Sequence, residues 1–198
     1  MVDLIIGTPD SGKSKRAEDL ALKLSGDGKR IYLATMDPFG EEGLNRVKKH
    51  RKMREGKGFV TIECTRDIAS VGEAIKDISN TTLLLECMAN LIGNEMHALE
   101  NKSADNSTIV EIVLDEVLTL SKKAKNMVIV SNEFEPDGEG YDEDTKRYVE
   151  LMHEVNEGLK KNVDKVHEIK EGELISYENT RACRWRSAAR RWSRSLDG

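Results

Sequence analysis

The chain has 198 residues, of which 38% are hydrophobic and 34% are charged, and its formal net charge is −5. This length suits one α/β domain and is short for two. No apolar run approaches the ~20 residues of a membrane-spanning helix, and the N-terminus lacks the charged start and cleavage site of a signal peptide. The three cysteines, Cys64, Cys87 and Cys183, show no metal-type spacing, so we expect a reduced, cytoplasmic protein.

Charge is unevenly distributed along the chain. Residues 179–198 hold six Arg and one Asp, a net charge of +5, so residues 1–178 carry −5 − 5 = −10. Phosphate contacts dominate nucleic-acid affinity, so this acidic body argues against nucleic acid as the main partner. The tail, rich in Arg and Trp, is compatible with an RNA- or membrane-binding segment. We favour non-native translation from a vector or a shifted reading frame, and exclude the tail from the predicted domain, residues 1–178.

A phosphate-binding pattern, G-x-x-x-x-G-K-S/T, directly follows the first apolar run, residues 2–6, and precedes a segment of helical period. Its residues are Gly7, Thr8, Pro9, Asp10, Ser11, Gly12, Lys13 and Ser14. The backbone N–H groups and the helix N-terminus of such a loop attract a β-phosphate. Lys13 would reach the β/γ oxygens, and the Ser14 hydroxyl would ligate Mg²⁺. The alternative is a plain Gly-rich turn; we predict a site for a nucleoside triphosphate.

The remaining elements follow from apolar period and turn residues. The predicted strands are residues 2–6, 30–35, 59–63, 82–87, 127–131, 163–169 and 173–177. The predicted helices are residues 17–24, 44–57, 68–78, 88–99, 109–120 and 148–159, and residues 36–43 are expected to form a loop. Alternating strands and helices predict an α/β fold: a mainly parallel sheet like that of P-loop NTPases, helices on both faces and a C-terminal antiparallel hairpin.

One predicted helix is unusually basic. Residues 46–57 hold seven Lys or Arg around His50. On a helix, Arg46, His50 and Arg54 share one face, which could meet the phosphates of a nucleotide. The alternative is a solvent-exposed basic helix, the commoner role of a charge run.

The apolar run at residues 82–87 is typical of a buried parallel strand and contains Glu86 near its end. P-loop proteins hold a carboxylate that contacts Mg²⁺ at this position, although Asp is the usual residue. The alternative is a Glu paired with a neighbouring Lys or backbone amide. Ligands of parallel sheets bind beyond the carboxyl ends of the strands. That rule brings one set of residues to a single edge: Lys13, Thr35, Glu63, Glu86 and Asn132.

Several short motifs occur in a characteristic order. They are Ser11-Gly12-Lys13-Ser14, Tyr32-Leu33-Ala34-Thr35, Arg46-Val47 with His50, Thr61-Ile62-Glu63, Leu83-Leu84-Leu85-Glu86-Cys87, Asn94, Ser131-Asn132-Glu133 and Val155-Asn156. Over roughly residues 1–178 the chain resembles the bifunctional adenosylcobinamide kinase / adenosylcobinamide-phosphate guanylyltransferases of cobalamin biosynthesis. It departs from their pattern at residues 134–141, where a Gly-Ile-Val-Pro-like turn is usual, and only Lys146-Arg147 echo a following arginine pair. Thr8-Pro9-Asp10 also replaces Gly-Ala-Arg-like residues.

The resemblance implies two reactions and a set of site residues. A nucleoside triphosphate, GTP or ATP, phosphorylates the aminopropanol hydroxyl of adenosylcobinamide, and GMP from GTP is then transferred to that phosphate through a guanylylated histidine. The histidine corresponds to His50, since a neutral imidazole can attack an α-phosphate while basic neighbours stabilise pyrophosphate. Ser14 and Glu86 correspond to the Mg²⁺ site. The implied nucleotide contacts are residues 7–14, Ala34, Thr35, Met36, Arg51, Lys52, Met53, Arg54, Glu63 and Glu86.

The resemblance also implies a trimer that binds GTP between subunits and a corrinoid as the small-molecule partner. Two other hypotheses stay open from the residues alone. One is a P-loop kinase of another small hydroxyl substrate, in which His50 is only an electrostatic contact; full activity of His50→Asn would favour it. The other is a nucleotide-gated interaction module whose acidic loop, residues 133–144, binds a protein. Tight GTP binding without corrinoid turnover would favour that hypothesis.

Overall fold

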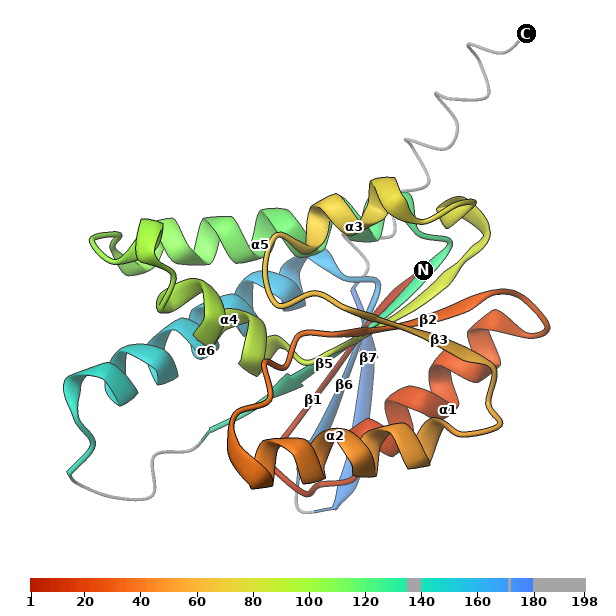
Figure 1. Cartoon of the computed structure of the whole chain (residues 1–198), viewed down its shortest axis with the longest axis horizontal. Coiled ribbons are helices and arrows are strands. Elements are labelled where there is room, and N and C mark those ends of the chain that lie inside the picture. The colour runs from red at the N-terminus through yellow and green to blue at the C-terminus, as the bar shows by residue number, and fades with distance from the viewer. Residues whose placement is uncertain (135–139, 171, 180–198) are drawn as a thin grey trace, which may run out of the picture.

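The computed structural model describes residues 1–134, 140–170 and 172–179. A seven-stranded sheet has the order β3-β2-β4-β5-β1-β6-β7 (Figure 1). The strands are β1 (Val2–Gly7), β2 (Arg30–Ala34), β3 (Phe59–Glu63), β4 (Thr82–Glu86), β5 (Asn126–Asn132), β6 (Lys165–Lys170) and β7 (Glu173–Glu178). Strands β1 to β6 are parallel, and β7 is antiparallel to β6. The predicted α/β class with a C-terminal antiparallel hairpin is confirmed.

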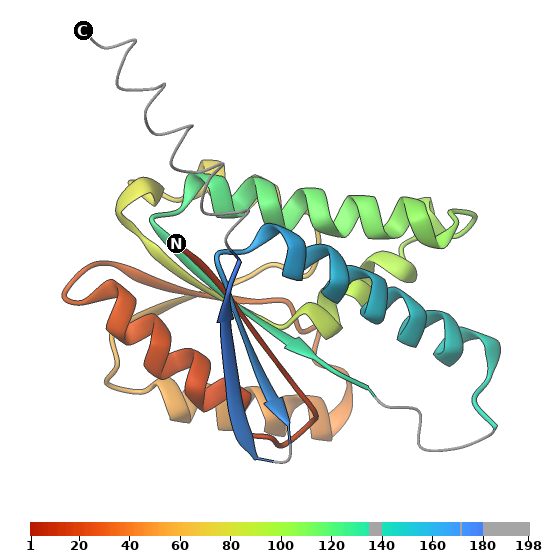
Figure 2. The same ribbon diagram turned by 180° about the vertical axis from the view of Figure 1, so that it is seen from behind.

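Helices cover both faces of this sheet. They are α1 (Lys13–Ser25), α2 (Gly40–Arg54), α3 (Ile68–Ala74), α4 (Met88–Met96), α5 (Asn106–Lys123) and α6 (Glu143–Asn162), with short 3₁₀ turns at Ile78–Asn80 and Leu99–Asn101. Figures 1 and 2 show α1 and α2 on one side of the sheet and α3 to α6 on the other. In the described part of the chain, no helix combines the length and apolar character that crossing a bilayer requires.

The core lies on both sides of the central strands. Leu83, Leu84 and Leu85 of β4 are all fully buried, because neighbouring side chains of a strand point to opposite faces and helices cover both. One apolar cluster fills the space between the sheet and α3 to α6, and a smaller one lies beneath α1. A continuous apolar run in the sequence therefore becomes a strand without a solvent-facing side.

Several predicted boundaries are wrong. The helices predicted over residues 44–57 and 88–99 end at Arg54 and Met96. Residues 40–43 belong to α2, not to a loop, because Gly40 adopts a positive φ of 67° and Glu41 and Glu42 lie in the first turn, where acidic side chains interact favourably with the helix dipole. The helix predicted over residues 68–78 ends at Ala74, since Ile75 is extended. The predicted Arg/Trp tail from residue 180 onward, and residues 135–139 of the predicted acidic loop, lie outside the described residues.

The carboxyl ends of the strands meet at one edge, as the sequence predicts. Gly7 pairs in register with Asn132, while Ala34 lies between Glu63 on one side and Glu86 on the other. The loop after β1 and the ends of four further strands therefore surround one region.

Candidate nucleotide-binding and transfer site

The loop between β1 and α1 depends on two glycines. Gly12, which directly precedes α1, has a φ of +81°, a conformation that favours glycine. A Cβ on Gly7 would lie 2.6 Å from the Ser11 Oγ and 3.2 Å from the Ile169 Cβ, so only glycine allows this close approach. The loop can therefore fold back on itself next to the N-terminus of α1, where unpaired N–H groups favour an anion.

Lys13 lies inside this loop. Its Nζ donates to the Thr8 carbonyl oxygen at 2.9 Å, and only 8% of the residue is exposed. Burial lowers the pKa of Lys13, whereas the nearby Cys87, Glu86 and Asp10 act in the opposite direction. Nearby phosphate oxygens would stabilise the charged form of the partly desolvated Lys13 ammonium, so the residue is suited to bind an anionic ligand.

Three elements converge on the Glu86 carboxylate at the end of β4. Ser14 Oγ, at the start of α1, donates to Glu86 Oε1 at 2.5 Å. His50 Nδ1, from α2, lies 3.5 Å from the same oxygen, within ion-pair distance although the two atoms do not form a hydrogen bond. Glu86 is only 7% exposed, and its Oε2 is buried without a hydrogen-bond partner in the described part of the chain.

This arrangement fits a divalent cation. Mg²⁺ prefers hard oxygen ligands, and a buried carboxylate oxygen with unused lone pairs lies beside a serine hydroxyl at a helix N-terminus. Glu86 is expected either to contact Mg²⁺ or to pair with a neighbouring Lys or backbone amide. Its side chain lies against Ser14 and His50, the residues expected to serve metal and transfer chemistry, which favours the first role.

The C-terminal half of α2 is fastened to the body of the protein. The Arg54 guanidinium carbon lies 3.3 Å from the centroid of the Tyr32 ring, a cation–π contact, and its Nη1 has no hydrogen-bond partner among the described residues. Just beyond the helix, Lys57 Nζ lies 2.6 Å from Oε2 of the fully buried Glu18 on α1. These contacts hold the basic side of the helix, with His50, over the sheet edge.

A cavity of about 590 Å³ opens between this basic helix, the loop and the strand ends. The predicted residues in its wall are Pro9, Asp10, Lys13, Ser14, Ala34, Met36, His50, Arg51, Arg54, Glu63 and Glu86. Arg46 and Asn132 line it too. We call this space the nucleotide cavity. It combines a phosphate-type loop, a buried carboxylate and several cations.

Comparison with known families agrees with this geometry. Residues 3–176 match the sequence profile of the family described as cobinamide kinase / cobinamide phosphate guanyltransferase. The chain belongs to this family. No curated protein matches the chain in a sequence comparison. Membership of the cobinamide kinase / cobinamide phosphate guanyltransferase family makes the chain a transferase of cobinamide metabolism that uses a nucleoside triphosphate.

Seven of the predicted nucleotide contacts lie outside the cavity wall: the loop residues Gly7, Thr8, Ser11 and Gly12, and also Thr35, Lys52 and Met53. Thr35 is fully buried, and its Oγ1 accepts from the Cys87 N–H at 2.9 Å and donates to the Cys87 carbonyl at 2.8 Å. Lys52 lines a separate surface groove on α2 with Arg51 and Arg54. Met53 lies between Lys52 and Arg54 on α2. The Thr35 side chain therefore positions the segment after Glu86.

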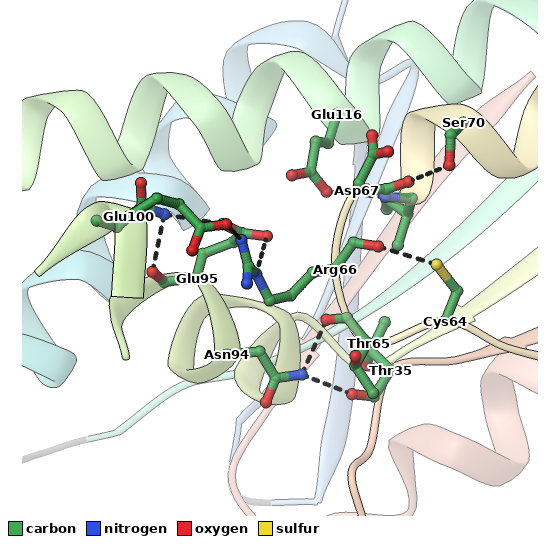
Figure 3. A network of polar contacts seen from close by, with 12 residues as sticks. Thr35, Cys64, Thr65, Arg66, Asp67, Ser70, Asn94, Glu95, Glu100 and Glu116 are labelled. Atoms are coloured by element: carbon green, nitrogen blue, oxygen red, sulfur yellow. Dashed lines mark hydrogen bonds and ion pairs between the residues drawn. The ribbon is translucent and has the colours of Figure 1, made fainter. Parts of the chain in front are cut away.

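A polar network supports the loops at this edge (Figure 3). Asn94 of α4 donates from Nδ2 to the carbonyl oxygens of Thr35 and Thr65, at 2.9 Å each. Arg66 follows Thr65, and its guanidinium contacts Glu95, at 3.1 Å, and Glu100. The segments that follow β2 and β3 are thus tied to α4, which begins two residues after Glu86.

Sequence reasoning missed other residues of the site. Tyr32, Asn90, Phe134 and Tyr148 also line the nucleotide cavity. Tyr32 sits in the second strand, where its alternation with Ile31 and Leu33 could have indicated that it faces α1 and α2. The other three offer no comparable local signal.

The basic pair Lys146-Arg147 on α6 does not line the nucleotide cavity. Arg147 donates from Nε to Asn106 Oδ1 at 2.9 Å and from Nη2 to the Ala104 carbonyl at 2.6 Å. Lys146 pairs with Glu143 at 2.8 Å. Arg147 therefore joins the start of α6 to the start of α5.

Proposed function

We propose that this protein phosphorylates adenosylcobinamide with a nucleoside triphosphate and then transfers GMP from GTP to adenosylcobinamide phosphate through a guanylylated His50, giving adenosylcobinamide-GDP. The convergence of Ser14 and His50 on one oxygen of Glu86 is the observation that carries the proposal. It joins a phosphate-binding loop to a nucleophile-type side chain at the same buried carboxylate.

The loop would hold the triphosphate. Backbone N–H groups of the loop, other than at Pro9, would face the anion, Lys13 would neutralise the β/γ oxygens, and Ser14 with Glu86 would hold Mg²⁺. The ion would supply charge neutralisation of the phosphates and leaving group. For the kinase reaction, the acceptor hydroxyl attacks the γ-phosphorus, the γ-phosphoryl bond to the β-oxygen breaks, and the hydroxyl proton leaves to solvent or a carboxylate. Either ATP or GTP suits that step.

His50 would carry GMP in the second reaction. Its Nδ1 faces Glu86, so an N–H at this nitrogen leaves the Nε2 lone pair free to attack the α-phosphorus. The N–P bond forms as the bond between the α-phosphorus and pyrophosphate breaks. Glu86 stabilises the positive charge that the imidazole acquires, while Arg46 and Arg54 face the same cavity as the leaving pyrophosphate. A phosphate oxygen of the acceptor then attacks, and the N–P bond breaks to restore the neutral imidazole.

The proposal includes a cytoplasmic homo-oligomer, a trimer by family resemblance. The outward side of α2 supports it, since most of this helix is exposed and only Arg54 is buried. A neighbouring subunit could meet the nucleotide across this basic helix.

Covalent labelling tests the proposal. GTP labelled at the α-phosphate is incubated with Mg²⁺ and protein, and the denatured chain is assayed for acid-labile, alkali-stable label. We expect label on the wild type and none on His50→Asn. The matched control is His153→Asn, an exposed histidine of α6 outside the cavity wall, which should label like the wild type.

The outcomes separate the alternatives. Label that persists in His50→Asn would overturn the assignment of the nucleophile. An unlabelled wild type that still phosphorylates a hydroxyl substrate would leave a kinase without covalent guanylyl transfer. An unlabelled wild type that binds GTP without any turnover would favour the nucleotide-gated interaction module.

A further inference from the structure

A second cavity, of about 650 Å³, borders the nucleotide cavity. The two share part of their walls, namely Ala89, Asn90 and Tyr148. The Tyr148 hydroxyl donates to the Ala89 carbonyl at 3.0 Å, so the shared wall is held by a contact between α4 and α6. A molecule in the second cavity therefore lies next to the nucleotide cavity, on the other side of this shared wall.

We infer that this second cavity, the acceptor groove, binds the corrinoid ring of the acceptor while the phosphate arm reaches the nucleotide cavity. The groove is defined by Asp37, Asn90, Gly93, His97, Asp144 and Tyr148. The inference rests on the proposed function and adds to it the place and the chemistry of acceptor recognition.

The charges of the two cavities differ as this acceptor requires. An adenosylated cobalt(III) corrinoid carries net positive charge on its ring, whereas its phosphorylated arm is an anion. Asp37 and Asp144 line the acceptor groove, whereas Lys13, His50 and Arg54 line the nucleotide cavity. Complementary potentials of this kind orient a ligand that carries opposite charges at its two ends.

The basic side chains of the acceptor groove are each paired with carboxylates. Arg66, which lines it, contacts the Glu95 and Glu100 carboxylates, and the first of these is buried. His97 Nε2 lies 3.5 Å from Asp144 Oδ2, linking the end of α4 to the first turn of α6. The groove as a whole therefore favours a cationic ligand.

The groove also suits the amide-bearing rim and the flat face of a corrin ring. Carboxylates such as Asp37 accept hydrogen bonds from amide NH₂ groups, and the Asn90 amide can both donate and accept. Met96, Ala98 and Leu99 add apolar surface, and Leu99 is 88% exposed at the rim. The wall thus offers both polar groups for the amide rim and apolar surface for the face of the ring.

Gly93 lines the groove without a side chain. A Cβ built there would meet one neighbour, Tyr148 Cε2 at 3.7 Å, which is ordinary van der Waals contact. Alanine should therefore fit, whereas a larger side chain would project into the groove. Because Gly93 lies within α4, either substitution also favours the helical backbone.

The test compares Gly93→Leu with its matched control Gly93→Ala. Binding of adenosylcobinamide is measured by equilibrium dialysis, with the visible absorption of the corrinoid as the readout, so that no catalytic step is needed. We expect Gly93→Leu to raise the Kd by about tenfold or more and Gly93→Ala to change it less than about threefold. Labelling with GTP should be unchanged in both variants, which shows that the fold and the nucleotide cavity are intact.

A charge variant provides an independent measurement. Asp37→Asn keeps the shape of the side chain and should raise the Kd by a few fold, more at low ionic strength than at high. Asp27→Asn, in the exposed turn between α1 and β2, is the control and should not change it.

Failure of the inference and failure of the proposed function are distinguishable. Unchanged corrinoid binding in Gly93→Leu and Asp37→Asn would overturn the acceptor groove and leave the proposed function standing, whereas no corrinoid binding by the wild type would overturn both. Corrinoid binding that is lost in Gly93→Leu, together with a wild type that GTP does not label, would support the groove and overturn the covalent mechanism alone.

Discussion

Replacing Thr35 with valine removes one hydroxyl from the junction between β2 and β4 at nearly constant volume. The hydroxyl is fully buried and makes two hydrogen bonds to Cys87, one with its N–H at 2.9 Å and one with its carbonyl at 2.8 Å. Cys87 directly follows Glu86 and precedes α4, so these bonds fix the segment that carries the shared carboxylate.

The two lost bonds do not cost the same. The Cys87 carbonyl keeps a second partner, the Leu91 N–H at 3.3 Å. Losing the bond from the Thr35 hydroxyl to this carbonyl therefore costs one ordinary hydrogen bond, about 0.5–1.5 kcal/mol. The Cys87 N–H has only the Thr35 hydroxyl among the hydrogen bonds of the described residues, and an unsatisfied buried donor costs about 1–3 kcal/mol. Together these costs predict that Thr35→Val lowers the free energy of unfolding by about 1.5–4.5 kcal/mol, less than the total stability of a typical domain.

Urea denaturation followed by circular dichroism measures this difference. The matched control is Thr61→Val on β3, where the side chain is exposed, and it should change the free energy of unfolding by less than about 0.5 kcal/mol. The rate of labelling by GTP should also fall in Thr35→Val, because Glu86 loses its support. A Thr35→Val protein as stable as the wild type would refute the assignment of a positioning role to this hydroxyl.

Two further changes probe buried charges. Burial raises the pKa of Glu116 from 4.5 to about 7, with Glu95 and Asp67 adding to the effect. The folded state therefore holds a proton that the unfolded state releases, and the free energy of unfolding falls as pH rises from about 4.5 to 7. Glu116→Gln, which can still accept the Ile68 N–H, should flatten this dependence in urea titrations at several pH values; an unchanged slope would contradict it. Lys57→Met should lower the free energy of unfolding by about 2 kcal/mol, because it leaves the Glu18 carboxylate buried without its partner at 2.6 Å. This value is smaller than for a fully buried pair because Lys57 is partly exposed to solvent. Adding Glu18→Gln should recover most of that loss, and no recovery in thermal unfolding would refute the charge argument.

Residues at strand ends could be predicted from the sequence because their positions depend on a general property of parallel sheets. Once β1, β2, β4 and β5 are recognised as parallel, their last residues must meet at one edge, and Glu86 lies there beside Ser14. The spacing of Arg46, His50 and Arg54 likewise needs only the period of a helix. Local pattern and backbone geometry suffice for these residues.

Contacts between distant elements could not be predicted in this way. Tyr148 lines both cavities because α6 crosses beside α4, and nothing near residue 148 in the sequence encodes that crossing. The Arg54–Tyr32 contact similarly depends on how α2 lies over β2. The Thr35 hydroxyl, after β2, bonds to the backbone of Cys87, after β4. This contact between two distant parts of the chain, and with it the positioning role of Thr35, could be seen only in the structure.

The acceptor groove gives the order of the two proposed reactions a physical basis. Asn90 and Tyr148 belong to both walls, so a corrinoid ring bound as proposed would lie beside the nucleotide cavity and extend its arm into it without leaving its own site. Before phosphorylation that arm ends in a neutral hydroxyl; afterwards it ends in an anion, which the cations around His50 attract. Phosphorylation would therefore strengthen the hold of the same cavity on the arm at the moment when it becomes the acceptor for GMP. On this view one edge of the sheet can serve both steps because the first reaction supplies the charge that the second one uses.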